Sequence, residues 1–298
     1  MTIRGVFCAA ATPVMADGEP DIARLAAHAK QLIADGCTGI ALLGTTGEAN
    51  SFSILERQKL LEVTIEAGIK PSQLMPGTGL CAAADTIALT RHALSLGVTK
   101  VVMLPPFYYK QPSDEGVFAA YARTIEKIGD ARLKIILYHI PQMSAVPLSL
   151  SLIEKLIAAY PNTVVGIKDS AGDFANMEKM VKEFPGFAIL AGADPLMKPL
   201  LEIGGAGCIT ATANLIGAQL ATVFHHFKDP ARKAEVQATQ DRIVKVRGIS
   251  TKFVQIPAIK AMIARRYNDN AWLNVRPPLV ALSSVQIDEI DSALTELG

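Results

Sequence analysis

The stretch Val164-Val165-Gly166-Ile167-Lys168 is a short apolar run that ends in an amine. An apolar run without polar alternation is typical of a strand buried on both faces, as in a parallel sheet. An amine at the end of such a strand loses part of its hydration and becomes nucleophilic near neutral pH, which Schiff-base chemistry on a ketone requires. We therefore interpret Lys168 as the reactive residue.

The rest of the chain alternates short apolar runs with longer amphipathic ones, which predicts strands joined by helical crossovers. We expect eight strands, at 6–12, 39–43, 74–78, 100–104, 134–140, 164–168, 187–191 and 207–211. Helical patterns lie between them, at 22–34, 53–67, 82–96, 114–128, 148–159, 174–183 and 195–203. Eight such units with short connections favour an α/β fold of the closed (β/α)8 TIM-barrel type, with the chemistry at the carboxyl ends of the strands.

The pattern changes after Asn214, because only helical patterns remain from about Gln219 to Gly298. We therefore divide the chain into a barrel core with the catalytic site at 1–218, and a last barrel helix with a helical carboxyl-terminal extension at 219–298. The extension contains Trp272 and the turn Arg276-Pro277-Pro278, which we interpret as structural.

The composition disfavours several classes of partner. The chain of 298 residues has 29 basic and 28 acidic side chains, and this balance disfavours nucleic acid or an anionic membrane surface. It has no apolar run long enough to predict a membrane helix, and the start Met1-Thr2-Ile3-Arg4-Gly5 lacks the features of a secretory signal. Four scattered cysteines show no metal-ligand spacing. We expect a soluble cytoplasmic protein without a metal site.

Polar side chains at two strand ends point toward Lys168. Strand alternation places Tyr138 on the same face as Ile136 and Ile140, where its phenol could exchange protons with a bound substrate, although a packed tyrosine is the alternative. Ser170 shares the face of Lys168 by the period of two, and its hydroxyl could bind a substrate oxygen or cap the turn before Gly172. Asp169 is expected to point the other way.

Two loops at the same end of the predicted barrel have distinct compositions. The loop Gly44-Thr45-Thr46-Gly47-Glu48-Ala49-Asn50 presents two hydroxyls and several backbone N–H groups, which suits a carboxylate. Glu48 is interpreted as a helix-start residue or as a support behind the site. The loop Pro105-Pro106-Phe107-Tyr108-Tyr109-Lys110 is aromatic, and its tyrosines either insert into a neighbouring subunit or form a hydrophobic cap.

These segments together resemble one family. The motifs stand in the order Gly44-Thr45-Thr46-Gly47-Glu48, Tyr138-His139-Ile140-Pro141, Gly166-Ile167-Lys168 and Gly192-Ala193-Asp194. In the order and spacing of these motifs, the chain resembles the dihydrodipicolinate synthase and N-acetylneuraminate lyase family of class I, pyruvate-handling aldolases. The resemblance covers essentially its whole length. The resemblance implies a (β/α)8 barrel with a helical extension, a homotetramer built as a dimer of dimers, and a covalent lysine imine in place of any cofactor.

The resemblance also implies roles for individual residues. Lys168 would form the Schiff base with pyruvate or a larger 2-oxo acid, and Tyr138 would act as the acid and base. Thr45 and Thr46 would bind the carboxylate, and Thr45 would also relay protons to a tyrosine from the neighbouring subunit. That tyrosine matches Tyr108 best, with Tyr109 as the alternative. Gly192 would line the pocket.

Departures from the family pattern limit the choice of substrate. Dihydrodipicolinate synthases have an arginine where this chain has Met143, and an arginine there binds the aldehyde's carboxylate. Sialic acid lyases have Asp-Glu and a serine where this chain has Asp194-Pro195 and Ala211. We expect Met143 and Asp194 to lie at the substrate pocket, and the enzyme to be an aldolase or lyase other than a dihydrodipicolinate synthase.

Three alternatives stay open at this stage. The same lysine imine could serve a sugar-acid dehydratase or decarboxylase, or a dihydrodipicolinate synthase with a non-standard aldehyde site. A non-catalytic 2-oxo acid binding protein is disfavoured, because a pure binder has no need for Lys168 together with Tyr138, Thr45 and Thr46.

Overall fold

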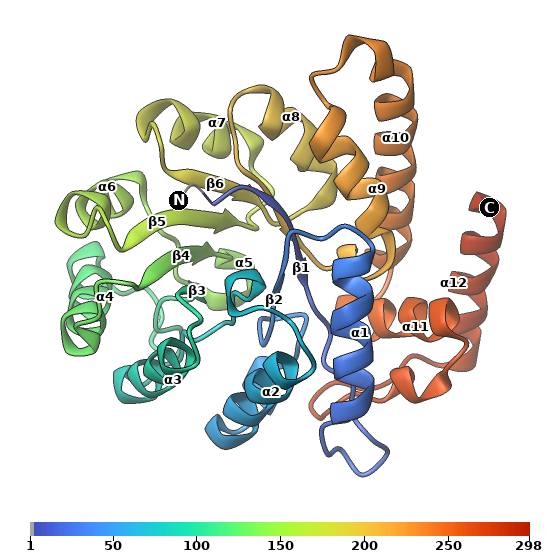
Figure 1. Ribbon diagram of the computed structural model, residues 1–298, viewed down its shortest axis with the longest axis horizontal. Coiled ribbons are helices and arrows are strands. Elements are labelled where there is room, and N and C mark those ends of the chain that lie inside the picture. The colour runs from blue at the N-terminus through green and yellow to red at the C-terminus, as the bar shows by residue number, and fades with distance from the viewer. Residues whose placement is uncertain (1–2) are drawn as a thin grey trace.

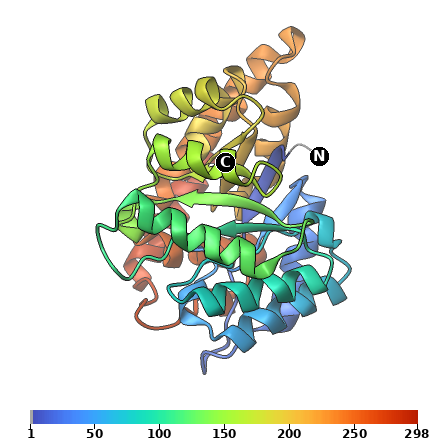
Figure 2. The same ribbon diagram turned by 90° about the vertical axis from the view of Figure 1, so that its left-hand side faces the viewer.

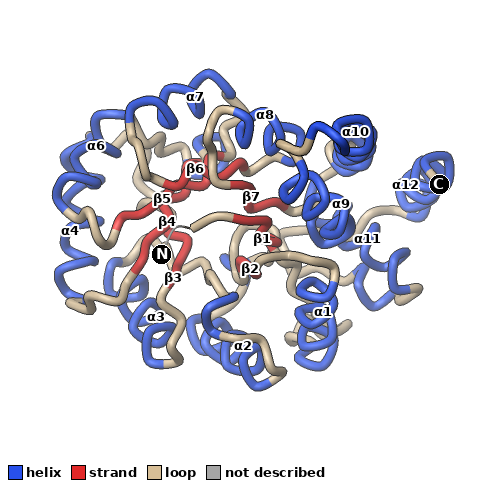
Figure 3. The backbone as a smooth tube through the Cα atoms, turned by 45° about the horizontal axis from the view of Figure 1, so that its top comes forward, coloured by secondary structure: helices blue, strands red, loops and turns tan. Residues whose placement is uncertain are grey.

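A ring of parallel strands forms the centre of the molecule, and the computed structural model describes residues 3–298 of the chain. The strands follow one another around the sheet in the order β2-β1-β7-β6-β5-β4-β3, and every neighbouring pair is parallel. Their bounds are β1 (Gly5–Ala9), β2 (Gly39–Ala41), β3 (Lys100–Met103), β4 (Lys134–His139), β5 (Val164–Asp169), β6 (Ala188–Ala191) and β7 (Gly207–Thr210). Helices surround this sheet on its outside (Figures 1 and 3).

The predicted strand at 74–78 does not form a regular strand, but its backbone closes the barrel between β2 and β3. The Met75 N–H donates to the Ile40 carbonyl at 2.9 Å, and the Val102 N–H donates to the Pro76 carbonyl at 3.0 Å. Proline has no N–H to give to a ladder, which interrupts the pairing at this point. The predicted (β/α)8 arrangement is therefore confirmed, with one irregular strand.

Helices cover the barrel and continue into the extension. The barrel helices are α1 (Ile22–Ala34), α2 (Ile54–Glu66), α3 (Ala83–Ser95), α4 (Asp114–Ile128), α6 (Leu150–Ala159), α7 (Phe174–Glu183), α8 (Met197–Glu202) and α9 (Ala213–His226). A short α5 (Pro141–Ser144) follows β4, and the extension consists of α10 (Lys233–Ser250), α11 (Gln255–Tyr267) and α12 (Ser284–Leu297). On the outside, α3 and α4 run side by side (Figure 2). The last helix, α12, carries the carboxyl terminus (Figure 1) and packs against α10 and α11.

Local signals explain where several helices begin. Before α2, α4, α6 and α12 stands a serine whose hydroxyl accepts an N–H from the first turn: Ser53, Ser113, Ser149 and Ser283. Packed against β1, α9 is the eighth barrel helix, and it starts at Ala213. The boundary that we place between 218 and 219 thus falls inside this helix, and the division into two parts stays a proposal.

Each strand contributes alternate residues to two apolar cores. Phe7, Ile136 and Leu190 pack inside the barrel, whereas Cys8 and Leu137 pack between the strands and the outer helices. This alternation fixes which strand residues face the barrel interior, and Tyr138 belongs to the inner set as predicted.

Within residues 3–298, every helix is too short or too polar to cross a bilayer. The same residues contain no group of three or more His, Cys, Asp or Glu side chains arranged to hold a metal ion. All four cysteines are free thiols, and three of them are buried.

A buried histidine links the barrel to its extension. The ring nitrogens of His28, on α1, lie 2.9 Å from the Tyr267 hydroxyl and 2.8 Å from the Asn214 side-chain oxygen. Burial disfavours the charged ring more than the bond to Asn214 favours it, and lowers the pKa of His28 from 6.5 to about 4. His28 is therefore neutral in the folded protein at neutral pH.

We expect His28 to make the fold acid-sensitive between pH 6.5 and about 4. Over this window the unfolded chain takes up a proton at His28 and the folded chain does not, so the free energy of unfolding falls by about 3 kcal/mol as the pH drops. Urea unfolding of wild type and His28→Gln across this window measures the difference. An equal loss of stability in both proteins would contradict this role of His28.

Candidate active site

Lys168 and Tyr138 lie side by side inside the barrel, near the carboxyl ends of β5 and β4. They stand opposite each other in the register of these two strands, and only 7% of Lys168 and 4% of Tyr138 is exposed. The Lys168 amine lies 4.2 Å from the centre of the Tyr138 ring. Gly166 allows the close approach of the next strand, because a Cβ there would meet the Ala188 carbonyl oxygen at 2.7 Å. The backbone thus holds the amine and the phenol in one small volume.

The Tyr138 hydroxyl is surrounded by groups that favour its ionised form. Burial by itself would raise the pKa of this phenol. The positive charge of Lys168 and hydrogen bonding to Thr45, Lys168 and Ser170 oppose burial and lower the pKa below its ordinary value of 10. The Thr45 hydroxyl lies 3.4 Å from the phenol oxygen. Tyr138 is therefore suited to accept and return protons within this group.

The threonine loop, residues 44–48, follows β2 and places Thr45 beside Tyr138. Its turn is closed by the Glu48 N–H, which donates to the Thr45 carbonyl at 3.1 Å. The Thr12 hydroxyl, in the segment that follows β1, donates to the Gly47 carbonyl at 2.8 Å. Only glycine fits at 47, because a Cβ there would meet the Ala10 carbonyl oxygen at 2.9 Å. Half-buried Thr45 and buried Thr46 are thus held in a tightly packed turn.

Ser170 and Gly192 join the same end of the barrel. The Gly192 N–H donates to the Asp169 carbonyl at 2.7 Å, and a Cβ at Gly192 would lie 2.0 Å from the Ser170 hydroxyl oxygen. Any larger residue at 192 would therefore displace the serine. The structure thus brings Lys168, Tyr138, Thr45, Ser170 and Gly192 together, with Thr46 in the adjoining turn.

Asp169 points away from this group, as the strand alternation predicts. Its carboxylate accepts the Ala171 N–H at 2.8 Å and the Asn176 amide at 3.1 Å. Opposite it on β4 stands His139, whose Nδ1 accepts the Leu148 N–H at 3.0 Å. Burial raises the pKa of Asp169 and lowers that of His139, so both shifts favour the neutral forms. The pair fixes the loops that follow β4 and β5.

Three further residues assigned from the sequence differ widely in exposure. Asp194 is fully buried, and its carboxylate accepts a hydrogen bond from Thr212 and lies 3.8 Å from Arg247 on α10. Met143, on α5, is 63% exposed. Tyr108 is also exposed, and its ring packs edge-on against Tyr109 at 5.4 Å. Within residues 3–298, no hydrogen bond joins either tyrosine to Thr45.

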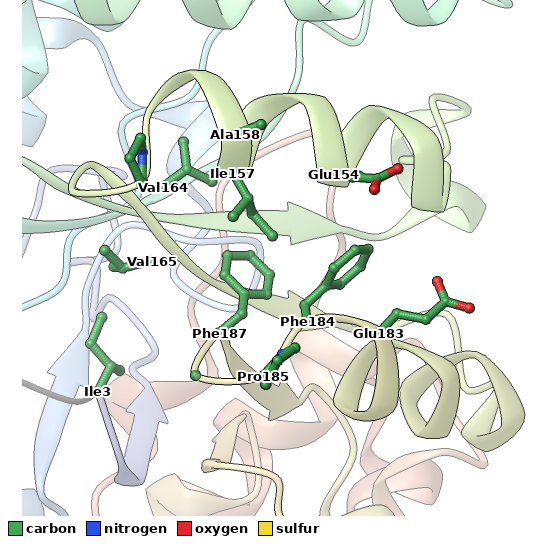
Figure 4. Close-up of a pocket in the computed structure, with 12 residues that line it drawn as sticks. Ile3, Glu154, Ile157, Ala158, Val164, Val165, Glu183, Phe184, Pro185 and Phe187 are labelled. Atoms are coloured by element: carbon green, nitrogen blue, oxygen red, sulfur yellow. The ribbon is translucent and has the colours of Figure 1, made fainter.

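Cavities distinguish the two ends of the barrel. A hollow of about 520 Å³ is lined by Ile157, Phe184, Phe187 and the first residues of β5, Val164 and Val165 (Figure 4). Lys168 stands at the opposite end of that strand, so this hollow has no part in chemistry at the amine. A much smaller cavity of about 30 Å³ adjoins Tyr138 and is large enough for a water molecule.

Two further buried cations near the threonine loop were not predicted. Arg57 lines the small cavity and donates to the Gly77 carbonyl at 2.8 Å, and burial lowers its pKa to about 10. Lys260, on α11, contacts Glu48. One available signal was the lone charge within Ile256-Pro257-Ala258-Ile259-Lys260-Ala261-Met262-Ile263-Ala264, a helix stretch otherwise apolar.

Comparisons with known proteins give matches over nearly the whole chain. A model of the dihydrodipicolinate synthetase family matches residues 2–297. An uncharacterized DapA-like lyase of Chloroflexus aurantiacus is 35% identical over 291 residues, which cover 97% of this chain and 95% of that protein. A 4-hydroxy-tetrahydrodipicolinate synthase of Rhizobium meliloti is 30% identical over 297 residues, which cover 99% of this chain and 98% of that protein.

Solved structures are similar over the same length. A dihydrodipicolinate synthase from Agrobacterium tumefaciens superimposes with a TM-score of 0.91 at 34% identity, covering 98% of this chain and 99% of that one. A chloride-inhibited dihydrodipicolinate synthase from Acinetobacter baumannii, complexed with pyruvate, also gives 0.91, at 28% identity, covering 100% of this chain and 99% of that one.

Proposed function

Because the chain belongs to the dihydrodipicolinate synthetase family of lyases, we propose that Lys168 forms a Schiff base with the keto carbon of pyruvate or a larger 2-oxo acid. The observation that carries this proposal is the buried Lys168 amine, which faces the Tyr138 phenol inside the barrel at 4.2 Å from its ring. A lysine in this setting is a nucleophile with a proton carrier beside it.

The proposed reaction uses only these side chains. The amine adds to the keto carbon, and Tyr138 passes the protons that allow the resulting hydroxyl to leave as water. Tyr138 then takes the proton of the hydroxyl on the carbon β to the imine carbon, the bond between the α and β carbons breaks to give an aldehyde, and its electron pair passes to the positive imine nitrogen to leave an enamine. Protonation of the enamine and addition of water to the imine release the 2-oxo acid and restore Lys168, and the reverse sequence forms the carbon–carbon bond. We propose that no metal or organic cofactor takes part, since the protonated imine supplies the electron sink.

The threonine loop is proposed to select the carboxylate of the 2-oxo acid. Thr45 and Thr46 would bind it through hydroxyl and backbone N–H groups, and Ser170 and Gly192 would line the opposite side. Oriented backbone amides bind an anion without placing a second full positive charge beside Lys168.

The partner substrate is proposed to differ from that of dihydrodipicolinate synthases. Met143 stands where the family resemblance places the arginine that binds the aldehyde's carboxylate, and the side chain is exposed. The thioether of Met143 cannot make the two charge-assisted hydrogen bonds that an arginine guanidinium makes to a carboxylate. We propose an aldolase or lyase whose partner carries no carboxylate at that position.

Dehydration or decarboxylation of a sugar acid is the second candidate, because both can proceed from the same imine. Met143 in place of the synthase arginine fits this candidate as well, since neither reaction uses an aldehyde partner with a carboxylate. A panel of 2-oxo acids and deoxy sugar acids, assayed for pyruvate, water loss and CO₂, separates the two. We expect pyruvate to be released, and CO₂ or a dehydrated acid without pyruvate would contradict the aldolase assignment.

The assembly is proposed to be a cytoplasmic homotetramer built as a dimer of dimers. Tyr108 and Tyr109 are 72% and 79% exposed, although large aromatic rings are usually buried, and a neighbouring subunit would cover them. One of them would then complete the proton path from Tyr138 through Thr45. Sedimentation of wild type against Tyr108→Ser and Tyr109→Ser tests whether these rings hold subunits together.

A further inference from the structure

A fully buried ion pair lies directly behind the threonine loop. Glu48 ends this loop, and its carboxylate contacts the amine of Lys260, which belongs to α11 of the extension. Both side chains are 0% exposed. The Lys260 amine also donates to the Asn274 carbonyl at 2.7 Å. The pair therefore joins the barrel to the extension next to Thr45 and Thr46.

A second residue of the extension holds the same carboxylate. The backbone N–H of Arg276 donates to the other Glu48 oxygen at 2.9 Å. The Arg276 guanidinium lies 4.1 Å from the centre of the Phe52 ring and donates to the Ser51 carbonyl at 2.7 Å. It also pairs with Glu56 on α2. Glu48 is thus fixed from two directions, and the segment that follows the threonine loop is fixed with it.

The backbone conformation at position 48 indicates that the glutamate side chain has a role there. Glu48 has a φ of 54° and a ψ of 30°, the left-handed conformation that favours glycine. A non-glycine residue there costs free energy and persists when the surroundings determine it. The same loop uses glycine at 44 and 47, yet this position has a glutamate that reaches into the extension.

We propose that Glu48 and Lys260 are positioning residues that set Thr45 and Thr46 for the carboxylate of the substrate, so that the helical extension is part of the substrate site. The inference rests on the proposed function, since it requires a 2-oxo acid at Lys168. It assigns the pair no contact with the substrate, because both side chains are buried behind the loop.

The double variant Glu48→Gln/Lys260→Met tests this role, because removing one charge alone would leave the other buried and unpaired. The readout is the concentration dependence of borohydride trapping at Lys168, with pyruvate and with hydroxyacetone, which lacks the carboxylate. A misplacement of about 1 Å can cost on the order of 100-fold. We expect the pyruvate concentration that gives half-maximal trapping to rise about 10- to 100-fold in the double variant. The hydroxyacetone concentration that gives half-maximal trapping should stay unchanged.

A matched control is the pair Arg266 and Asp35, which also joins the extension to the barrel, at 2.6 Å. Asp35→Asn/Arg266→Met should leave pyruvate trapping unchanged. If the double variant at 48 and 260 does not fold, Glu48→Asp keeps the charge but shortens its reach, and it should shift the pyruvate dependence in the same direction.

The outcomes separate this inference from the proposed function. Wild type that shows no saturable trapping by pyruvate would overturn the proposed function itself. The positioning role alone would be overturned by a different result. In that result, pyruvate traps wild type, and a folded variant at Glu48 reaches half-maximal trapping at the same pyruvate concentration as wild type. An equal loss with pyruvate and hydroxyacetone would also overturn it, since a general loss of structure explains that result.

Discussion

Replacing Lys168 with alanine is expected to abolish turnover. The proposed chemistry passes through a covalent bond to this amine, and no other lysine lies within the group formed by Tyr138, Thr45, Ser170 and Gly192 in the part of the chain that the structure describes. Loss of a covalent nucleophile lowers kcat by on the order of 10⁶-fold in other enzymes. Steady-state assays with the best substrate of the panel measure the effect, and circular dichroism verifies the fold.

Lys168→Arg is the matched control for the charge at this position. It keeps a cation beside Tyr138, but its guanidinium does not add to a ketone at neutral pH. We expect it to be as inactive as Lys168→Ala. Substantial activity in either variant would mean that the reaction does not pass through a Lys168 imine.

Replacing Tyr138 with phenylalanine is expected to lower kcat by about 100- to 10,000-fold, the usual contribution of a positioned acid or base. The ring and its contact with Lys168 remain, and only the hydroxyl beside Thr45 is lost. The pKa of Tyr138 is lowered, mainly by the charge of Lys168 against the opposing effect of burial, so its ionisation should produce a limb in the wild-type pH profile at a lower pH than that of a free phenol. That limb should be absent from Tyr138→Phe.

Tyr121→Phe is the corresponding control. Tyr121 is also buried, and its hydroxyl donates to the Met103 carbonyl at 3.0 Å on the outer side of the sheet. The variant loses one buried hydrogen bond outside the group at Lys168, so its activity and pH profile should match wild type. Equal losses in both variants would show that the effect at Tyr138 is one of packing.

Local patterns were sufficient to predict the barrel and the centre of the candidate site. Strand alternation placed Tyr138 inside and Asp169 outside, and both placements are confirmed because a period of two follows from strand geometry alone. The bounds of α1, α4 and α7 agree with the predicted ranges, because amphipathic periodicity and capping residues are local signals. A strand was predicted at 74–78 but its irregularity was not, although Pro76 was a signal that its pairing would be interrupted.

Residues whose environment depends on distant segments were not predictable in this way. Asp194 follows β6 at the expected end of the barrel, but its orientation depends on Thr212 and on Arg247 of α10, which are brought to it only by the fold. The Glu48 and Lys260 pair likewise joins segments far apart in the sequence. No local pattern in the chain specifies such pairings.

Reduction with borohydride in the presence of pyruvate, followed by peptide mass spectrometry, tests the central claim most directly. Reduction of the imine should leave one pyruvate-derived group on the peptide that contains Lys168, and the peptide that contains Lys260 should stay unmodified. A Lys168 peptide that remains unmodified at saturating pyruvate and with the best substrate of the panel would contradict the covalent mechanism.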